Sequence, residues 1–142
     1  MQFLPTTGNP LVVRTDCESS YIWDTICELI RAPQHEATYT FFAHVDFLDD
    51  ADLRDLSAED LLLRVLKDYV HSVLFVVDTV AARSPEFPIL VVDLHRQRGR
   101  TFRAIPSQIR AIENNLSLAN MDFAEFADNA GADGVFRGFR RR

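Results

Sequence analysis

The feature that most constrains the fold is a pair of predicted strands in the middle of the chain, at residues 72–78 and 89–94, with uninterrupted apolar runs at 73–77 and 89–92. Strands of this kind have no polar face, so both of their faces must be covered, as in the centre of an α/β sheet. The link between them, residues 79–87, is shorter than a parallel crossover requires and contains Pro85. These two strands are therefore predicted to be antiparallel neighbours.

The segments before this pair alternate between strand and helix. A β-branched run at 11–16 is followed by an amphipathic helix, capped at Ser19 or Ser20, and by an aromatic-rich strand at 38–47. A capping box then opens a second helix at Ser57. Because a helix between successive strands is the usual parallel crossover, the first three strands are predicted to be parallel, in βαβαβ order.

The segments after the pair favour a second antiparallel connection. Residues 95–100 resemble a hairpin loop that leads into a fifth strand at 101–105. Pro106 suits the first position of a further helix, and Asp122 caps a short one. Residues 134–139 form either a closing strand or a docked tail.

Together these elements predict a single α/β domain over residues 1–142, with a mixed sheet of about five strands and C-terminal helices. Residues 1–10 are expected to form an N-terminal arm, and residues 140–142 a loose basic tail. The composition is 47% hydrophobic, which is sufficient for a substantial core. No apolar run approaches the ~18 residues that a membrane span needs, so no membrane association is expected.

The charge argues against a nucleic-acid-binding protein, because the net charge is −6 and phosphate binding requires clustered cations. Residues 1–95 carry 6 basic and 16 acidic side chains, whereas residues 96–142 carry 9 and 5. Lys67 is the single lysine, and the other cations are arginines, which suit bidentate pairing with carboxylates. The two parts of the chain are therefore expected to pair with each other.

The two cysteines, Cys17 and Cys27, are too few for a disulfide framework and lack a second ligand pair for zinc. No metal site and no cofactor are predicted. The first residues have neither a basic segment nor a long apolar one, so no secretory signal is expected. These features favour a cytoplasmic protein with free thiols.

Two segments near the C-terminus carry a family resemblance. They are 112–123, with the sequence IENNLSLANMDF, and 133–139, with the sequence DGVFRGF. With earlier marks such as VRTD at 13–16, LVVDL at 90–94 and GRTFR at 99–103, the chain resembles a small family of uncharacterised proteins common in actinobacteria. The resemblance covers nearly the whole chain and implies a single α/β domain, but it implies no reaction, cofactor or catalytic residue.

Three aspartates are candidates for catalysis. Asp16, Asp46 and Asp78 each stand at or near the predicted carboxyl end of a strand, the edge where open parallel sheets usually bind ligands. If they cluster there, they could ligate a divalent cation or provide an acid beside an ionised base. The alternative is that each caps a helix or turn, or pairs with Arg14, Arg100 or Arg103.

One histidine and six further side chains complete the candidate site. His44 lies two residues from Asp46 in the predicted strand, so the two would share a sheet face and act together in acid–base chemistry, unless His44 is a structural group. The amide-rich tract 114–120 either holds turns through backbone hydrogen bonds or lines a polar pocket, with Ser117 among its members. A separate aromatic group, Trp23, Phe41, Phe42 and Phe47, either packs in the core or forms a pocket wall. The candidate ligand-binding residues are Arg14, Trp23, Arg100, Arg103, Asn115 and Asn120.

Three functions from different classes fit these features. The first is a small cofactor-free enzyme that performs proton transfer of the lyase, isomerase or cyclase type on a small organic molecule. The second is an interaction module of the inhibitor or immunity type, whose acidic loop at residues 49–55 docks a basic protein. The third is a small-molecule binder without catalysis. A homodimer through the fifth strand or through the tail at 136–139 is a further expectation.

Overall fold

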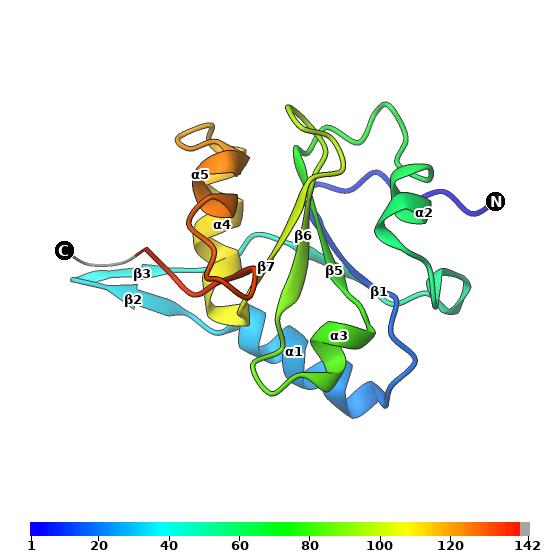
Figure 1. The fold of residues 1–142 in the computed structure, drawn as a ribbon, viewed down its shortest axis with the longest axis horizontal. Coiled ribbons are helices and arrows are strands. Elements are labelled where there is room, and N and C mark those ends of the chain that lie inside the picture. The colour runs from blue at the N-terminus through cyan, green and yellow to red at the C-terminus, as the bar shows by residue number, and fades with distance from the viewer. Residues whose placement is uncertain (140–142) are drawn as a thin grey trace.

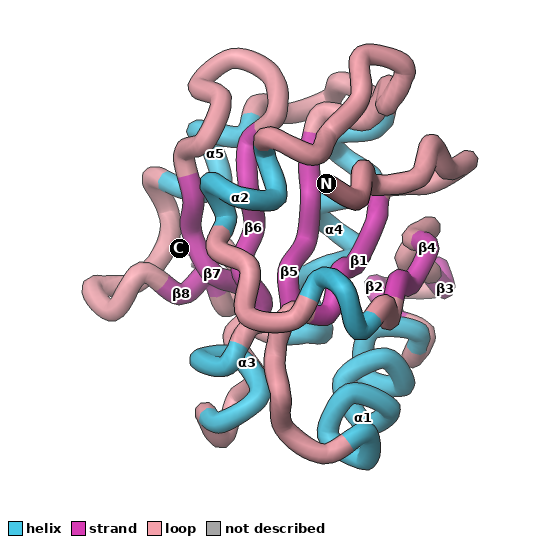
Figure 2. The backbone as a smooth tube through the Cα atoms, turned by 90° about the vertical axis from the view of Figure 1, so that its right-hand side faces the viewer, coloured by secondary structure: helices cyan, strands magenta, loops and turns pink. Residues whose placement is uncertain are grey.

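A six-stranded mixed sheet forms the middle layer of the computed structural model, which describes residues 1–139. The three parallel strands β4, β1 and β5 lie together, β6 is antiparallel to β5 and to β7, and β8 is parallel to β7 (Figure 2). The strand order is β4-β1-β5-β6-β7-β8, with β1 at Leu11–Arg14, β4 at Asp46–Leu48, β5 at Val73–Val77, β6 at Ile89–Asp93, β7 at Thr101–Ala104 and β8 at Val135–Phe136. The predicted basic tail at 140–142 lies outside the described residues.

Helices cover both faces of the sheet, which explains the uninterrupted apolar runs. Alternate residues of β5 point to opposite faces. Phe75 belongs to the core under α1 (Ser20–Arg31), α4 (Ile109–Ser117) and α5 (Phe123–Ala127). Leu74 belongs to the core under α2 (Ala58–Leu62) and the N-terminal segment, where Leu4 is buried. Figure 1 shows α4 and α5 on one side of the strands and α2 on the other.

The mixed α/β fold predicted from the sequence is confirmed. The link between β5 and β6 holds only the short α3 (Thr79–Arg83), and the two strands are antiparallel as predicted. The loop between β6 and β7 turns at Gly99, whose φ of 93° lies in the region that favours glycine. Pro106 begins a 3-10 turn (Pro106–Gln108) that leads directly into α4.

The strand predicted at 38–47 is wrong in its middle. Residues Tyr39–Phe41 form β3, which pairs with β2 (Gln34–Glu36) in a separate hairpin that projects from the body (Figure 1). Extended pairing resumes only at β4, because Ala43 and Val45 pack against the core and the backbone N–H of His44 donates to Glu113 at 2.8 Å. The connection is thereby drawn toward α4 and away from a strand path.

The second helix is shorter than predicted from the apolar stripe in its sequence, which consists of Leu61, Leu62, Val65 and Leu66. The capping box at Ser57 and Asp60 is present, but α2 ends at Leu62 and a turn follows, in which Arg64 N–H donates to Leu61. The N-terminal segment occupies the next position, since Leu4 N–H donates to the Arg64 carbonyl at 2.9 Å. A short 3-10 turn, η1 (Ala51–Leu53), lies in the acidic loop before α2. No helix within residues 1–139 combines the length and the apolar character needed to cross a membrane.

The C-terminal segment is docked by an aromatic cluster. The Phe136 ring is completely buried and lies 5.4 Å from Phe126 and 5.0 Å from Phe139, between ring centroids. β8 pairs with the outer side of β7 at Arg103 and Ala104, so this half of the fifth predicted strand is not an edge. The described sheet edges are instead the short strands β4 and β8.

Replacing Phe136 with alanine is expected to lower the free energy of unfolding by about 3–5 kcal/mol, because the change leaves a cavity inside the aromatic cluster. Urea denaturation measures the difference. Phe42→Ala is the matched control: this ring is 51% exposed, so a change within about 0.5 kcal/mol is expected. Equal losses in the two variants would contradict the docked arrangement.

Candidate functional site

The three candidate aspartates do not share one site. β1 and β5 end at the same edge of the sheet, where the backbone N–H groups of Thr15 and Asp16 both donate to the Val77 carbonyl. Asp16 and Asp78 therefore lie at this carboxyl edge. Asp46 is the first residue of β4 and pairs in register with Leu11, so it lies at the opposite edge. The condition for a shared site, that all three meet at one edge, is not met, because the predicted strand is broken before Asp46.

Asp16 is half of a buried ion pair. Its side chain is completely buried and accepts from Arg14 Nε at 3.2 Å and from the Glu18 N–H at 3.0 Å. Arg14 also contacts Asp49 at 3.2 Å and donates to the Glu18 carbonyl at 2.7 Å. These contacts fasten the β1–α1 loop to the acidic loop.

Asp78 is equally engaged. One oxygen accepts the Ala81 N–H at 2.9 Å and caps α3, and the two oxygens receive Arg103 in bidentate fashion at 2.9 and 2.6 Å. Arg103 also donates to the Pro88 carbonyl. Both Asp78 and Arg103 thus have the pairing and capping roles that the sequence allowed as an alternative to catalysis.

The remaining predicted binding residues are dispersed. Trp23 is buried against Phe47, with ring centroids 6.1 Å apart, so it packs in the core. Arg100 pairs with Asp128 at 2.6 Å. Asn115 donates to the Ala111 carbonyl, and its own carbonyl accepts the backbone N–H of Asn120, so this part of the amide-rich tract holds a turn. Within residues 1–139 no three His, Cys, Asp or Glu side chains gather as metal ligands.

The sheet edge where β1 and β5 begin carries a hollow of about 330 Å³ that we call the His44 hollow. His44 from the connection before β4 and His71 from the segment before β5 both line it. The end of α4 supplies its floor. The full lining is Gly8, Asn9, Pro10, His44, His71, Glu113, Asn114, Ser117 and Leu118.

Glu113 is the central group of this hollow, although its side chain is only 4% exposed. One oxygen accepts the His44 backbone N–H and the Asn114 amide, both at 2.8 Å. The other accepts the Ser117 hydroxyl at 2.7 Å, across one turn of α4. The His44 imidazole is 68% exposed, and its Nδ1 lies 3.6 Å from Glu113, which is beyond hydrogen-bond range but within ion-pair distance.

Neighbouring acceptors favour a particular placement of the proton on each imidazole. A carboxylate only accepts, so Glu113 favours the His44 tautomer with the proton on Nδ1 and an accepting Nε2. His71 Nε2 lies 2.7 Å from the Thr7 carbonyl, which also only accepts, so this nitrogen carries a proton. His71 packs edge-on against Tyr69, with ring centroids 5.0 Å apart.

The sequence analysis placed His44 among the candidate catalytic residues and Ser117 in a candidate polar pocket. It did not single out Glu113 or His71 as residues of this hollow. The spacing of Glu113 and Ser117, four residues apart on one helix, was a visible signal for their contact. No local spacing connects His71 with His44, because they come from segments far apart in the chain. Their proximity depends on the break before β4.

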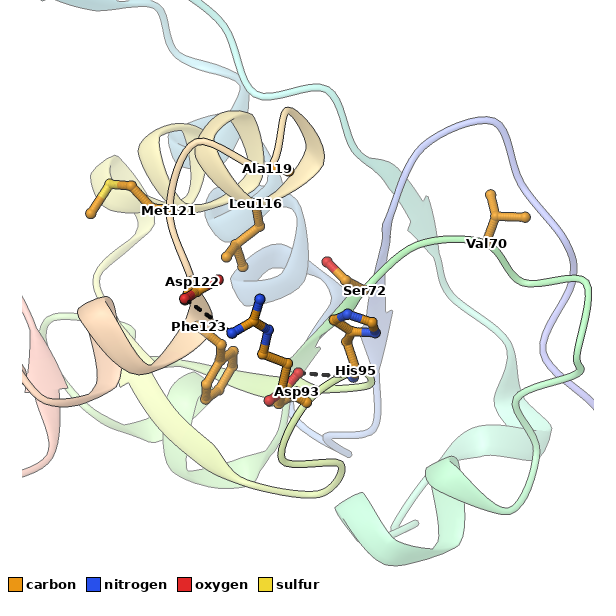
Figure 3. Close-up of a pocket in the computed structure, with 10 residues that line it drawn as sticks. Val70, Ser72, Asp93, His95, Leu116, Ala119, Met121, Asp122 and Phe123 are labelled. Atoms are coloured by element: carbon orange, nitrogen blue, oxygen red, sulfur yellow. Dashed lines mark hydrogen bonds and ion pairs between the residues drawn. The ribbon is translucent and has the colours of Figure 1, made fainter.

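A second hollow, which we call the Asp93 hollow, lies at the same edge and has a volume of about 310 Å³ (Figure 3). Asp93 at the end of β6 and His95 line one side, and residues around the start of α5 line the other. Segments 70–72 and 116–119 contribute lining residues to both hollows. The full lining is Val70, Ser72, Asp93, His95, Arg96, Leu116, Ala119, Met121, Asp122 and Phe123.

Comparisons with known proteins point to one family. A family model described as "Domain of unknown function (DUF6924)" matches residues 9–139. No curated protein matches the chain.

Replacing Asp16 with alanine is expected to lower the free energy of unfolding by about 1–3 kcal/mol, because it removes a buried acceptor of Arg14 Nε and leaves Asp49 as the remaining carboxylate beside that guanidinium. Chemical denaturation measures this loss. Asp24→Ala, an exposed change on α1, is the control and should shift stability by no more than about 0.5 kcal/mol. A loss no larger than that of the control would show that Asp16 is not structural.

Asp49 is expected to make part of the stability dependent on pH. Burial raises the pKa of Asp49, but the hydrogen bonds and charges of Arg54 and Arg14 outweigh it and hold the pKa below its usual value. A carboxyl with a lowered folded-state pKa stabilises the fold above its unfolded pKa, about 3.9, and this contribution disappears as the pH falls through the folded value. The stability difference between the wild type and Asp49→Asn, measured by urea denaturation from neutral to acid pH, should be constant at neutral pH and shrink below about pH 4. A difference independent of pH would contradict this assignment.

Proposed function

Because the chain belongs to the DUF6924 family, whose description names no function, we propose a function from the residues of this chain alone. The His44 hollow binds a small organic molecule, and the His44 imidazole exchanges a proton with it. The protein is then a cofactor-independent acid–base enzyme of the lyase, isomerase or cyclase type. The observation that carries this proposal is the buried Glu113 carboxylate facing Nδ1 of the exposed His44.

The Glu113–His44 arrangement supports general acid–base catalysis. A buried carboxylate beside one ring nitrogen orients an imidazole and stabilises its charged form, while the other nitrogen works on the substrate. The Nδ1 contact at 3.6 Å is loose, and contacts of this kind commonly tighten when substrate binds. His44 Nε2 has no hydrogen-bond partner within the described residues, so a ligand can use it.

Other groups around the hollow supply polar recognition. Asn114 and Ser117 both hold Glu113, and they thereby fix its carboxylate relative to His44. With Nε2 of His71 held by Thr7, the Nδ1 of neutral His71 is an acceptor. Two imidazoles and a buried carboxylate in one hollow suit a substrate that gives up one proton and receives another.

The protein-interaction alternative has less support from the acidic loop. Asp49 is paired with Arg14 and Arg54, and the Asp50 side chain caps η1. Asp55 accepts from the Cys17 thiol at 3.3 Å. These carboxylates serve contacts within the chain, so we favour a small-molecule partner over a basic protein.

The exposed Cys17 thiol suits a reducing compartment, and we place the protein in the cytoplasm.

His44→Gln is expected to abolish proton transfer and leave the fold intact, because the side chain is mostly exposed. The assay incubates the protein in D₂O with pools of common metabolites and detects deuterium incorporation or new products by mass spectrometry. A metabolite that exchanges with wild-type protein should exchange about 10²–10⁴-fold more slowly with His44→Gln. Glu113→Gln should also slow exchange while keeping a hydrogen-bonding side chain at the same position.

His35→Gln, an exposed change on the β2–β3 hairpin, is the matched control and should exchange at the wild-type rate. A thermal-shift screen of the same pools separates binding from catalysis, because a ligand of the folded state raises the melting temperature. Ligands that raise the melting temperature through His44 without any exchange would indicate a binder that does not catalyse. Exchange that His44→Gln leaves unchanged would refute the proposed role of His44.

A further inference from the structure

Asp93 is a buried carboxylate that no cation of the described chain neutralises. The residue is 2% exposed, and its two oxygens accept the backbone N–H groups of His95 and Gln97, both at 2.9 Å. Within residues 1–139 it forms no ion pair with an arginine, lysine or histidine side chain. Burial of a charge is costly unless the charge is paired. The Asp93 hollow therefore has an excess of negative charge on its floor.

A second carboxylate lies across the same hollow. Asp122 is paired with Arg96 at 3.4 Å, and both side chains are more than half exposed, so this pair is loose and screened by solvent. Figure 3 shows Asp93, His95 and Asp122 among the lining residues, and a dashed line marks the ion pair of Asp122 with Arg96. Two carboxylates against one guanidinium repel an anion and attract a cation.

The rest of the lining is apolar, apart from Ser72. Leu116 and Met121 are partly buried, and the ring of Phe123 is almost completely buried against Phe102, with centroids 5.0 Å apart. An apolar wall beside a carboxylate floor fits a molecule with an apolar body and a charged head.

We propose that the Asp93 hollow is a binding site for a small organic ammonium compound. The ammonium head replaces Arg96 at Asp122 and lies toward Asp93, while the apolar body packs on Leu116, Met121 and Phe123. Arg96 thus acts as a tethered cation that competes with the ligand. The proposal does not depend on proton transfer at His44, because the two hollows share no lining residue.

Three probes with the same ring and different charge test this proposal. They are benzylammonium, benzyl alcohol and benzoate, each titrated into the full-length ¹⁵N-labelled protein and followed by NMR. Benzylammonium is expected to give saturable shifts at the amides of His95, Arg96, Asp122 and Phe123. Benzyl alcohol should bind more weakly and benzoate most weakly, and added salt should weaken the binding of benzylammonium alone.

Substitutions of two exposed residues test whether the hollow binds a cation or an anion, and both leave the buried Asp93 unchanged. Arg96→Gln removes the tethered cation and is expected to raise the affinity for benzylammonium about two- to fivefold. Asp122→Asn keeps a side chain that can cap α5 and is expected to lower the affinity by a similar factor, about two- to fivefold. His44→Gln should leave the affinity for benzylammonium unchanged. A negative result for the Asp93 hollow is therefore distinguishable from a negative result for proton transfer at His44.

Any of three results would overturn the proposal. The first is the absence of saturable shifts for benzylammonium at these amides. The second is tighter binding of benzoate than of benzylammonium, with a loss of benzoate affinity in Arg96→Gln, which would identify an anion site. The third is equal binding of all three probes, which would identify an unspecific apolar surface.

Discussion

The rest of the structure depends on the burial of β5 from both sides. All five of its residues are buried, and they alternate between the two cores. A strand with no exposed residue must have a neighbour on each side and a layer on each face. β1 and β6 are those neighbours, and the helices and the N-terminal segment are those layers. The direction of β6, however, is decided by the short link after β5, which holds only α3.

This reversal determines which groups meet at each edge of the sheet. Because β6 runs against β5, its last residue, Asp93, comes to the edge where β1 and β5 begin. His71 and Asn9 precede those strands, so they reach the same edge. At the opposite edge, the ends of β1 and β5 are followed by the pairs of Asp16 with Arg14 and Asp78 with Arg103. Both hollows therefore lie away from the carboxyl edge that parallel sheets commonly use.

The sequence predicted the elements better than the site, and there is a physical reason for the difference. Apolar runs, caps and the proline at the start of the 3-10 turn act locally, so the strands at 72–78 and 89–94 could be placed and their direction argued. The site depends on contacts between distant segments, such as His44 with Glu113, which are 69 residues apart. The sequence predicted that aspartates stand at the strand ends. A local pattern does not show, however, that these carboxylates form ion pairs with Arg14 and Arg103. The charge asymmetry along the chain did predict part of this, since Arg103, Arg110 and Arg137 pair with Asp78, Glu36 and Glu86.

The distribution of arginines separates structural from functional carboxylates. Asp16 and Asp78 have guanidinium partners, which is the expected solution for a carboxylate removed from water. Glu113 and Asp93 are almost as buried as Asp16, whereas Asp78 is partly exposed, yet neither Glu113 nor Asp93 lies within ion-pair distance of an arginine or lysine in the described part of the chain. A chain so rich in arginine would gain stability by pairing them, so their isolation costs stability. Costs of this kind are retained where a group acts on a ligand, and both carboxylates line a hollow at the same edge. Each of these two carboxylates is buried, lacks an arginine or lysine partner and lines a hollow. These three properties together are the physical argument for placing function at this edge.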